Sequence, residues 1–192
     1  PKAVALARDV GIESVSLDLI FAVPGQTHAD LRDDIDSLLR LNPDHVSCYC
    51  LTIEAGTAFQ RDVDAGQLKP TSNDWQGRQF AYVRHRLRAA GFVHYEISNF
   101  AKPGALCRHN LTYWRNHPSH GIGNGAASHL GGIRRMNHRD VLEYVQHIEP
   151  GGGAAAVNSE EVLDTERKIR ETAYLALRTS EGIVPRRFLR DT

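Results

Sequence analysis

The sequence predicts an α/β fold that contains a parallel β-sheet. Helix-type and strand-type patterns alternate along its first part, and short connections join them, which is the arrangement of βα units. The composition, 41% hydrophobic and 24% charged residues in 192, is that of a globular protein with one good core. Two strands do not close a parallel sheet, so we expect further strands from a longer protein.

The first elements follow from hydrophobic periodicity and from end signals. A short amphipathic helix is expected before Gly11, which stops it. A strand is predicted over 15–22, because its apolar side chains recur at every second position, Val15, Leu17, Leu19 and Phe21, in alternation with Ser16, Asp18 and Ile20. A helix capped by Thr27 follows, and residues 45–52 are predicted as the next strand.

The later elements are predicted in the same way. A helix is expected over 73–90, and a strand over 92–98. A short strand within 131–137 and a short helix over 139–148 come next. Residues 159–178 carry many charges and an apolar stripe, which predicts one long helix.

A glycine-rich run divides the chain into two predicted domains. Residues 151–156 read Gly-Gly-Gly-Ala-Ala-Ala, a composition typical of a flexible break. The domain boundary is therefore placed between 1–150, which carries the βα units, and 151–192, the start of a small helical domain.

Charge and cysteine content exclude several classes of protein. The net charge is zero with a pI near 7.6, which disfavours a nucleic-acid or anionic-membrane surface. No apolar run is long enough to span a bilayer, and three cysteines favour a reducing, cytoplasmic location. Both ends interrupt helical patterns, so we expect a fragment that is unstable or self-associates when isolated.

Asp18 is a candidate site residue because of its phase in the first strand. It alternates with Leu17 and Leu19, so if these pack on outer helices its carboxylate faces the interior of a barrel. A buried carboxylate needs a donor partner or a ligand. Two interpretations stay equally open: a structural ion pair, and a ligand-binding role near the end of the strand.

Cys48 and Cys50 share one face of the second predicted strand. Such a pair is compatible with metal binding, but two small core residues are the favoured interpretation because no second pair stands nearby. The sequence contains no C-x₃-C-x₂-C motif.

A further group of candidate site residues lies in one segment ahead of the glycine-rich run 121–125: Cys107, His109, Tyr113 and Trp114. An imidazole or a thiolate is a competent axial ligand of haem iron, and aromatic rings can stack on a porphyrin. A satisfied structural histidine and packed aromatic rings are the alternative. The glycine spacing is not that of a dinucleotide-binding loop, so we predict a tight loop that lets the backbone approach a cofactor or a barrel rim.

Several strings together resemble the HemW family of radical S-adenosylmethionine haem chaperones, within the oxygen-independent coproporphyrinogen III oxidase-like group. The strings are SLDLIFAVPGQT (16–27), LTIEAGT (51–57), YEISNFAKPG (95–104), HNxxYW (109–114) and GIGNGAAS (121–128). Ala22 stands where the family usually has glycine. The resemblance implies the C-terminal part of a partial, TIM-like (β/α) radical SAM barrel, followed by the start of a small helical domain.

The resemblance also implies cofactors and partners. Asp18 would contact S-adenosylmethionine, and His109 would contact haem, with Cys107 as the less secure alternative. A 4Fe-4S cluster would have its ligands upstream of this chain. The implied partners are haem and acceptor haemoproteins, with respiratory proteins and transient contacts to membrane proteins among the expectations.

Two other functions remain open. An oxygen-independent coproporphyrinogen III oxidase, which decarboxylates propionates by radical chemistry, belongs to the same superfamily, although HNxxYW favours the chaperone. A βα enzyme without a redox cofactor would use Asp18 and Glu96 as acid and base, provided that both face one cavity.

Overall fold

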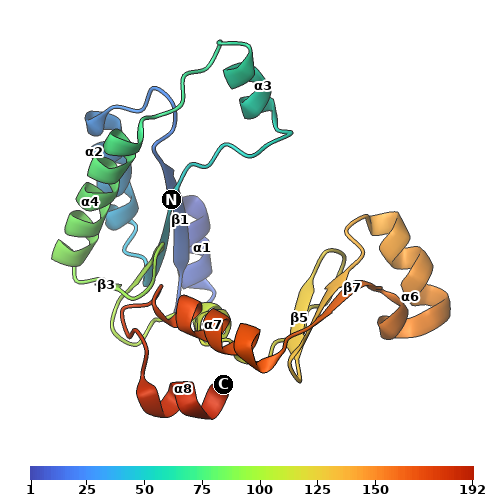
Figure 1. Ribbon diagram of the computed structural model, residues 1–192. Helices are drawn as coiled ribbons and strands as arrows, with labels where there is room; N and C mark the ends of the chain where they lie inside the picture. The colour runs from blue at the N-terminus through green and yellow to red at the C-terminus, as the bar shows by residue number, and fades with distance from the viewer. The chain divides into compact units, whose positions relative to one another are not determined.

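The computed structural model describes residues 1–192, except that it does not describe the burial of residues 151 and 191. The chain forms two compact units, Pro1–Cys107 and Arg108–Thr192, and the predicted α/β class is confirmed (Figure 1). The predicted boundary after residue 150 stays a prediction. None of the described helices is long and apolar enough to cross a membrane.

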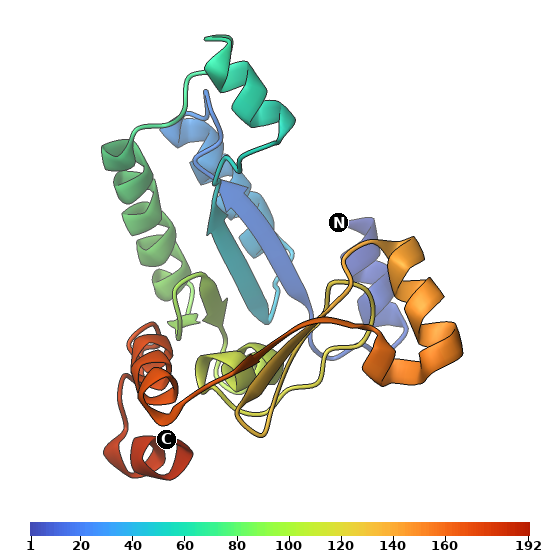
Figure 2. The same cartoon turned by 45° about the vertical axis from the view of Figure 1, so that its right-hand side comes forward.

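The first unit contains a four-stranded mixed sheet with strand order β1-β2-β4-β3. Strands β1 and β2 are parallel, and they lie side by side in Figure 2, whereas β4 runs antiparallel to both β2 and β3. The elements are α1 (Lys2–Asp9), β1 (Ser16–Phe21), α2 (His28–Arg40), β2 (His45–Cys50), α3 (Ala58–Asp64), α4 (Asn73–Ala89), β3 (Val93–His94) and β4 (Asn99–Ala101).

The predicted strand over 92–98 is wrong in its extent. Only Val93–His94 is a strand, and a turn leads from it directly into the antiparallel strand β4. The capping box of α2 agrees with the sequence, because Thr27 and Asp30 bond each other's backbone N–H groups.

One face of this sheet packs against helices α2 and α4 and forms the core. The buried side chains are apolar on both sides of that interface: Phe21, Val46, Cys48 and Phe100 from the sheet, Leu31, Ile35 and Leu38 from α2, and Val83 and Leu87 from α4. Cys50 packs on the same cluster. Burial raises the pKa of the Cys48 thiol to about 12, so it remains protonated. The interpretation as a core residue is confirmed for Cys48, whereas Cys50 is only partly buried against the core.

The second unit contains a three-stranded antiparallel sheet with strand order β5-β6-β7. Its elements are α5 (Arg108–Trp114), β5 (Ala127–Leu130), β6 (Ile133–Asn137), α6 (Val141–Ala155), β7 (Val157–Val162), α7 (Thr165–Ala176) and α8 (Pro185–Asp191). The predicted glycine break falls inside α6, which kinks at Gly152 with φ 68° and ψ −170°.

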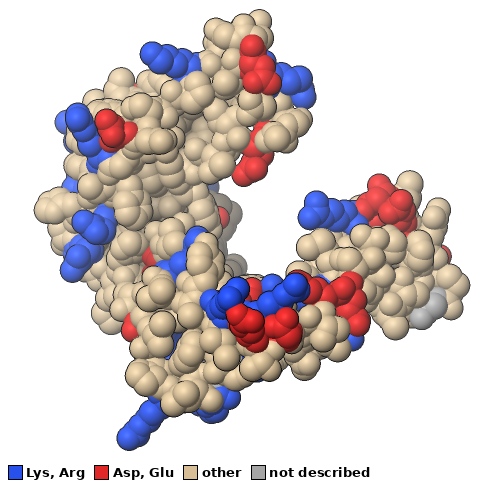
Figure 3. Space-filling view, viewed as in Figure 1, with Lys and Arg blue, Asp and Glu red and all other residues tan. Residues whose placement is uncertain are grey.

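The prediction of one helix over 159–178 is wrong in its first part. Residues Val157–Val162 form β7, and α7 begins only after Asp164, whose side chain caps it. The pairing with β6 places Glu160 opposite Arg135, and Glu160 Oε2 lies 2.8 Å from Arg135 Nε. Cross-strand pairs of opposite charge support a strand against local helix propensity. Figure 3 shows acidic and basic side chains intermingled, in agreement with the zero net charge.

Candidate functional site

The face of the first sheet that lies away from α2 and α4 is polar. Strand pairing places Asp18 beside Ser47 and Ser47 beside Asn99, so these three side chains form one row across β1, β2 and β4. Ser16 and His45 are paired one step further along. We call Ser16, Asp18, His45, Ser47 and Asn99 the polar face. Asp18 is exposed, while the three members from β2 and β4 are buried.

His45 links the strands of the polar face through both ring nitrogens. Its Nδ1 lies 2.8 Å from Ser16 Oγ, and its Nε2 lies 2.8 Å from the hydroxyl of Tyr95. Burial lowers the pKa of the imidazole, and the nearby Asp18 carboxylate opposes this only in part. A neutral ring donates through one nitrogen and accepts through the other, so both hydroxyls are satisfied.

Because His45 joins this hydrogen-bond network in its neutral form, we expect the protein to lose stability in acid. Because the pKa of His45 is below its usual value of 6.5 in the folded state, the unfolded chain binds more protons as the pH falls below 6.5. The contribution of His45 to the free energy of unfolding is therefore present above pH 6.5 and is lost below it. Urea unfolding of the full-length protein at pH 7.5 and 5.5 should show this loss, and His45→Gln should reduce it.

His129 should contribute independently to the acid sensitivity, so its variant serves as a comparison for His45→Gln. Burial and the neighbouring Arg134 lower its pKa as well, so His129→Gln should remove a separate part of the acid sensitivity. An acid sensitivity that is identical in His45→Gln and the parent would contradict the assignment.

Two acceptors are buried: Glu96, in the turn before β4, and Asn99, a member of the polar face. Glu96 is 3% exposed; its Oε2 accepts a hydrogen bond from the backbone N–H of Ser98, but its Oε1 has no partner among the described residues. Asn99 is 5% exposed, and its Oδ1 likewise has no hydrogen-bond partner among the residues that the structure describes. The sequence did not single out Asn99, because its row with Asp18 depends on the pairing of β2 with β4.

His109 and Tyr113 lie together on helix α5. Their rings meet edge to face, with centroids 4.7 Å apart, as expected for positions i and i+4. Both side chains are exposed. The sequence predicted no helix in this segment, because seven residues are too few to show a repeated apolar stripe. Cys107 immediately precedes the helix and is half-buried.

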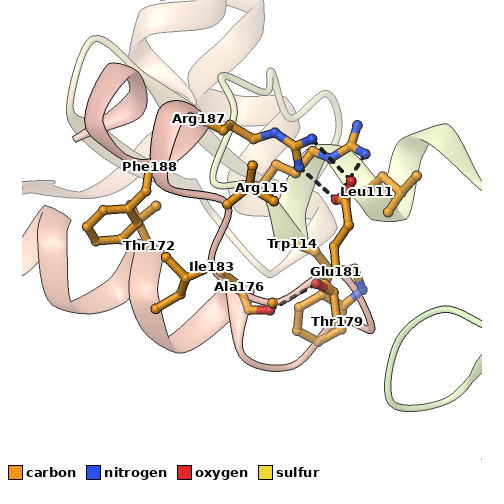
Figure 4. A pocket seen from close by; sticks show the side chains of 12 residues that line it. Leu111, Trp114, Arg115, Thr172, Ala176, Thr179, Glu181, Ile183, Arg187 and Phe188 are labelled. Atoms are coloured by element: carbon orange, nitrogen blue, oxygen red, sulfur yellow. Dashed lines mark hydrogen bonds and ion pairs between the residues drawn. The ribbon is translucent and has the colours of Figure 1, made fainter.

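Trp114 belongs to a different environment from that of His109. The guanidinium of Arg178 lies 5.3 Å from the centre of its ring. Trp114 also lines a cavity of about 30 Å³ between α5, α7 and the segment that leads into α8, where Arg115 and Arg187 converge on Glu181 (Figure 4). A cavity of this volume holds about one or two waters and no planar tetrapyrrole. The HNxxYW string therefore divides into an exposed pair and a packed tryptophan.

The glycine-rich run 121–125 forms the predicted tight loop, but its backbone approaches its own hairpin. A Cβ atom on Gly121 would lie 2.5 Å from the carbonyl oxygen of Ala127. The Gly121 N–H donates to Ser128 Oγ at 2.9 Å, and Asn137 Nδ2 donates to the Gly123 carbonyl at 2.8 Å. Glycine at 121 is thus required by packing within the second unit.

An iron–sulfur cluster has no ligand set in the part of the chain that the structure describes. No group of three or more His, Cys, Asp or Glu residues there is arranged to hold a metal ion. The orphaned oxygens of Glu96 and Asn99 instead fit an organic ligand that donates hydrogen bonds.

Comparison with curated proteins gives several long matches. The chain is 37% identical over 182 residues to "Heme chaperone HemW" of Bacillus subtilis, covering 95% of this chain and 48% of that protein. It is 36% identical over 173 residues to the HemW of Mycobacterium tuberculosis H37Rv, covering 90% and 44%. A mitochondrial protein of Danio rerio, "Radical S-adenosyl methionine domain-containing protein 1", is 30% identical over 190 residues, covering 95% and 42%.

A solved structure has the same fold. Its title is "Coproporphyrinogen III oxidase (HemN) from Escherichia coli is a Radical SAM enzyme", and it matches with a TM-score of 0.75 at 21% identity, over 92% of this chain and 43% of that one. No protein-family model matches. The chain spans about half the length of the curated relatives. It belongs to the HemW family of the radical S-adenosylmethionine proteins.

Proposed function

We propose that the full-length protein is a haem chaperone, which binds haem and passes it to acceptor haemoproteins, respiratory proteins among them. S-adenosylmethionine and a 4Fe-4S cluster would be its cofactors, with Asp18 as a contact of the former and cluster ligands outside this chain. The observation that carries the proposal is the exposed His109 imidazole beside Tyr113 on α5. The HemW names of the relatives support it.

An exposed ligand suits transfer better than storage. A neutral imidazole ligates haem iron directly, and the Tyr113 ring, whose centroid lies 4.7 Å from that of His109, would contact the porphyrin plane. Because His109 is already at the surface, haem can be taken up and released without opening the core. Cys107 is half-buried and therefore the weaker candidate for the same role.

Haem titration of the full-length protein, followed by Soret absorbance, tests the proposal. We expect His109→Ala to weaken haem binding at least about tenfold, which corresponds to about 1.4 kcal/mol. Cys107→Ser should change it less. His85→Ala, which alters an exposed histidine on α4, is the matched control and should bind haem like the parent.

The two contrary outcomes have different meanings. If Cys107→Ser loses haem and His109→Ala does not, the ligand is the thiolate. If neither variant changes the titration, haem binds elsewhere, and the chaperone proposal loses the observation that carries it.

A second candidate, coproporphyrinogen III oxidation, is favoured by one observation, the fold shared with HemN. That likeness concerns the fold alone at 21% identity. An assay of the reconstituted full-length protein for propionate decarboxylation separates the two. A turnover that survives His109→Ala would favour the oxidase.

A further inference from the structure

We infer that Glu96 and Asn99 extend the Asp18 site into a row of acceptors that binds the donor groups of S-adenosylmethionine. The inference rests on the proposed function, because Asp18 is assigned there to that ligand. It adds Asn99 on β4 and Glu96 in the turn before β4, and each offers an oxygen atom that has no donor among the described residues.

The strand pairing determines the span of the row. Asp18, Ser47 and Asn99 occupy paired positions on β1, β2 and β4. Neighbouring strands are about 4.8 Å apart, so Asp18 and Asn99 are separated by about 10 Å. S-adenosylmethionine carries an ammonium group and two ribose hydroxyls as donors, together with a positive sulfonium. A ligand of this size can bond acceptors at both ends of such a row.

Glu96 lies in a turn that docks on β2 through its backbone. The Cys48 N–H donates to the Ser98 carbonyl at 2.7 Å, which holds the turn on β2 next to Ser47. The Glu96 carboxylate in turn accepts the Ser98 N–H at 3.0 Å. Its second oxygen, Oε1, has no hydrogen-bond partner among the described residues.

Because Glu96 Oε1 and Asn99 Oδ1 are buried, their lack of a hydrogen-bond partner among the described residues points to a ligand. A buried acceptor without a donor is unfavourable, and a carboxylate oxygen more so than an amide oxygen. Both side chains are at least 95% buried, since Glu96 is 3% and Asn99 5% exposed. The arrangement becomes favourable when a ligand supplies N–H or O–H donors, and the positive charge of S-adenosylmethionine compensates the carboxylates.

Calorimetric titration of the full-length, cluster-loaded protein with S-adenosylmethionine tests the inference. Glu96→Gln and Asn99→Leu should each weaken binding about tenfold, the scale of a lost charge-assisted or buried hydrogen bond. Asp18→Ala should weaken it as well. Thermal unfolding of the same variants without ligand is the second measurement, and neither Glu96→Gln nor Asn99→Leu should lower the melting temperature.

Gln79→Leu is the matched control. Gln79 lies on α4, is fully buried, and both polar atoms of its side chain lack partners within the described chain. It belongs to the helix that covers the opposite face of the sheet, so its replacement should leave the affinity for S-adenosylmethionine unchanged.

The outcomes separate this inference from the proposed function. If Asp18→Ala weakens binding while Glu96→Gln and Asn99→Leu bind like the parent, the row is wrong and the Asp18 assignment stands. If all three variants bind like the parent, the polar face is not the cofactor site. A loss of affinity accompanied by an equal loss of unliganded stability would show that Glu96 and Asn99 are structural, and would overturn the inference.

Discussion

Replacing Gly121 with alanine is expected to destabilise the protein by about 3 kcal/mol, the upper range for overpacking. The added Cβ would lie 2.5 Å from the Ala127 carbonyl oxygen and 2.9 Å from its nitrogen. These are backbone atoms of β5, so no side chain can rotate away. Moving the loop would break the hydrogen bond from the Gly121 N–H to Ser128 Oγ. Urea unfolding of the full-length protein measures the effect.

Gly77→Ala is the control for this experiment. Gly77 lies inside α4, and nothing stands within 4 Å of a Cβ placed on it. Alanine is the better helix former by about 1 kcal/mol, so this variant should be slightly more stable than the parent. Equal unfolding midpoints for Gly121→Ala and the parent would show that the loop does not approach β5 as described.

Replacing Trp114 with alanine is expected to lower the free energy of unfolding by about 2 kcal/mol, less than the 3–5 kcal/mol of a fully buried tryptophan. The ring is partly buried, carries the guanidinium of Arg178 on its face, and lines the small cavity shown in Figure 4. The loss therefore combines apolar contacts with a cation–π interaction. Chemical unfolding of the full-length protein is the measurement.

Tyr113→Ala is the counterpart on the other side of α5. Its ring is 46% exposed and touches His109, so its removal should change stability by less than about 0.5 kcal/mol while weakening haem binding. A Trp114→Ala variant with unchanged stability and lost haem binding would reverse the assignment of the two aromatic residues.

The sequence alone predicted the elements whose signals are local. The alternation of Leu17, Asp18 and Leu19 identified β1 and placed the carboxylate opposite the apolar side chains. Thr27 and the apolar stripe that follows it identified α2. These predictions succeed because a strand's period and a helix cap are properties of neighbouring residues. The HNxxYW string likewise identified the family from sequence, and the comparisons confirm it.

Only the tertiary structure decided the features that depend on distant pairing. Strand β7 exists because Glu160 and its neighbours pair with β6, which outweighs their helix propensity. The row from Asp18 to Asn99 requires β2 to lie between β1 and β4, through the pairing of Asp18 with Ser47 and of Ser47 with Asn99, which are distant in the sequence. The division between Tyr113 and Trp114 arises because α7 and the segment after it cover one side of α5 and leave the other open. In each case the stabilisation comes from contacts between segments that are distant in the sequence, and local periodicity does not encode such contacts.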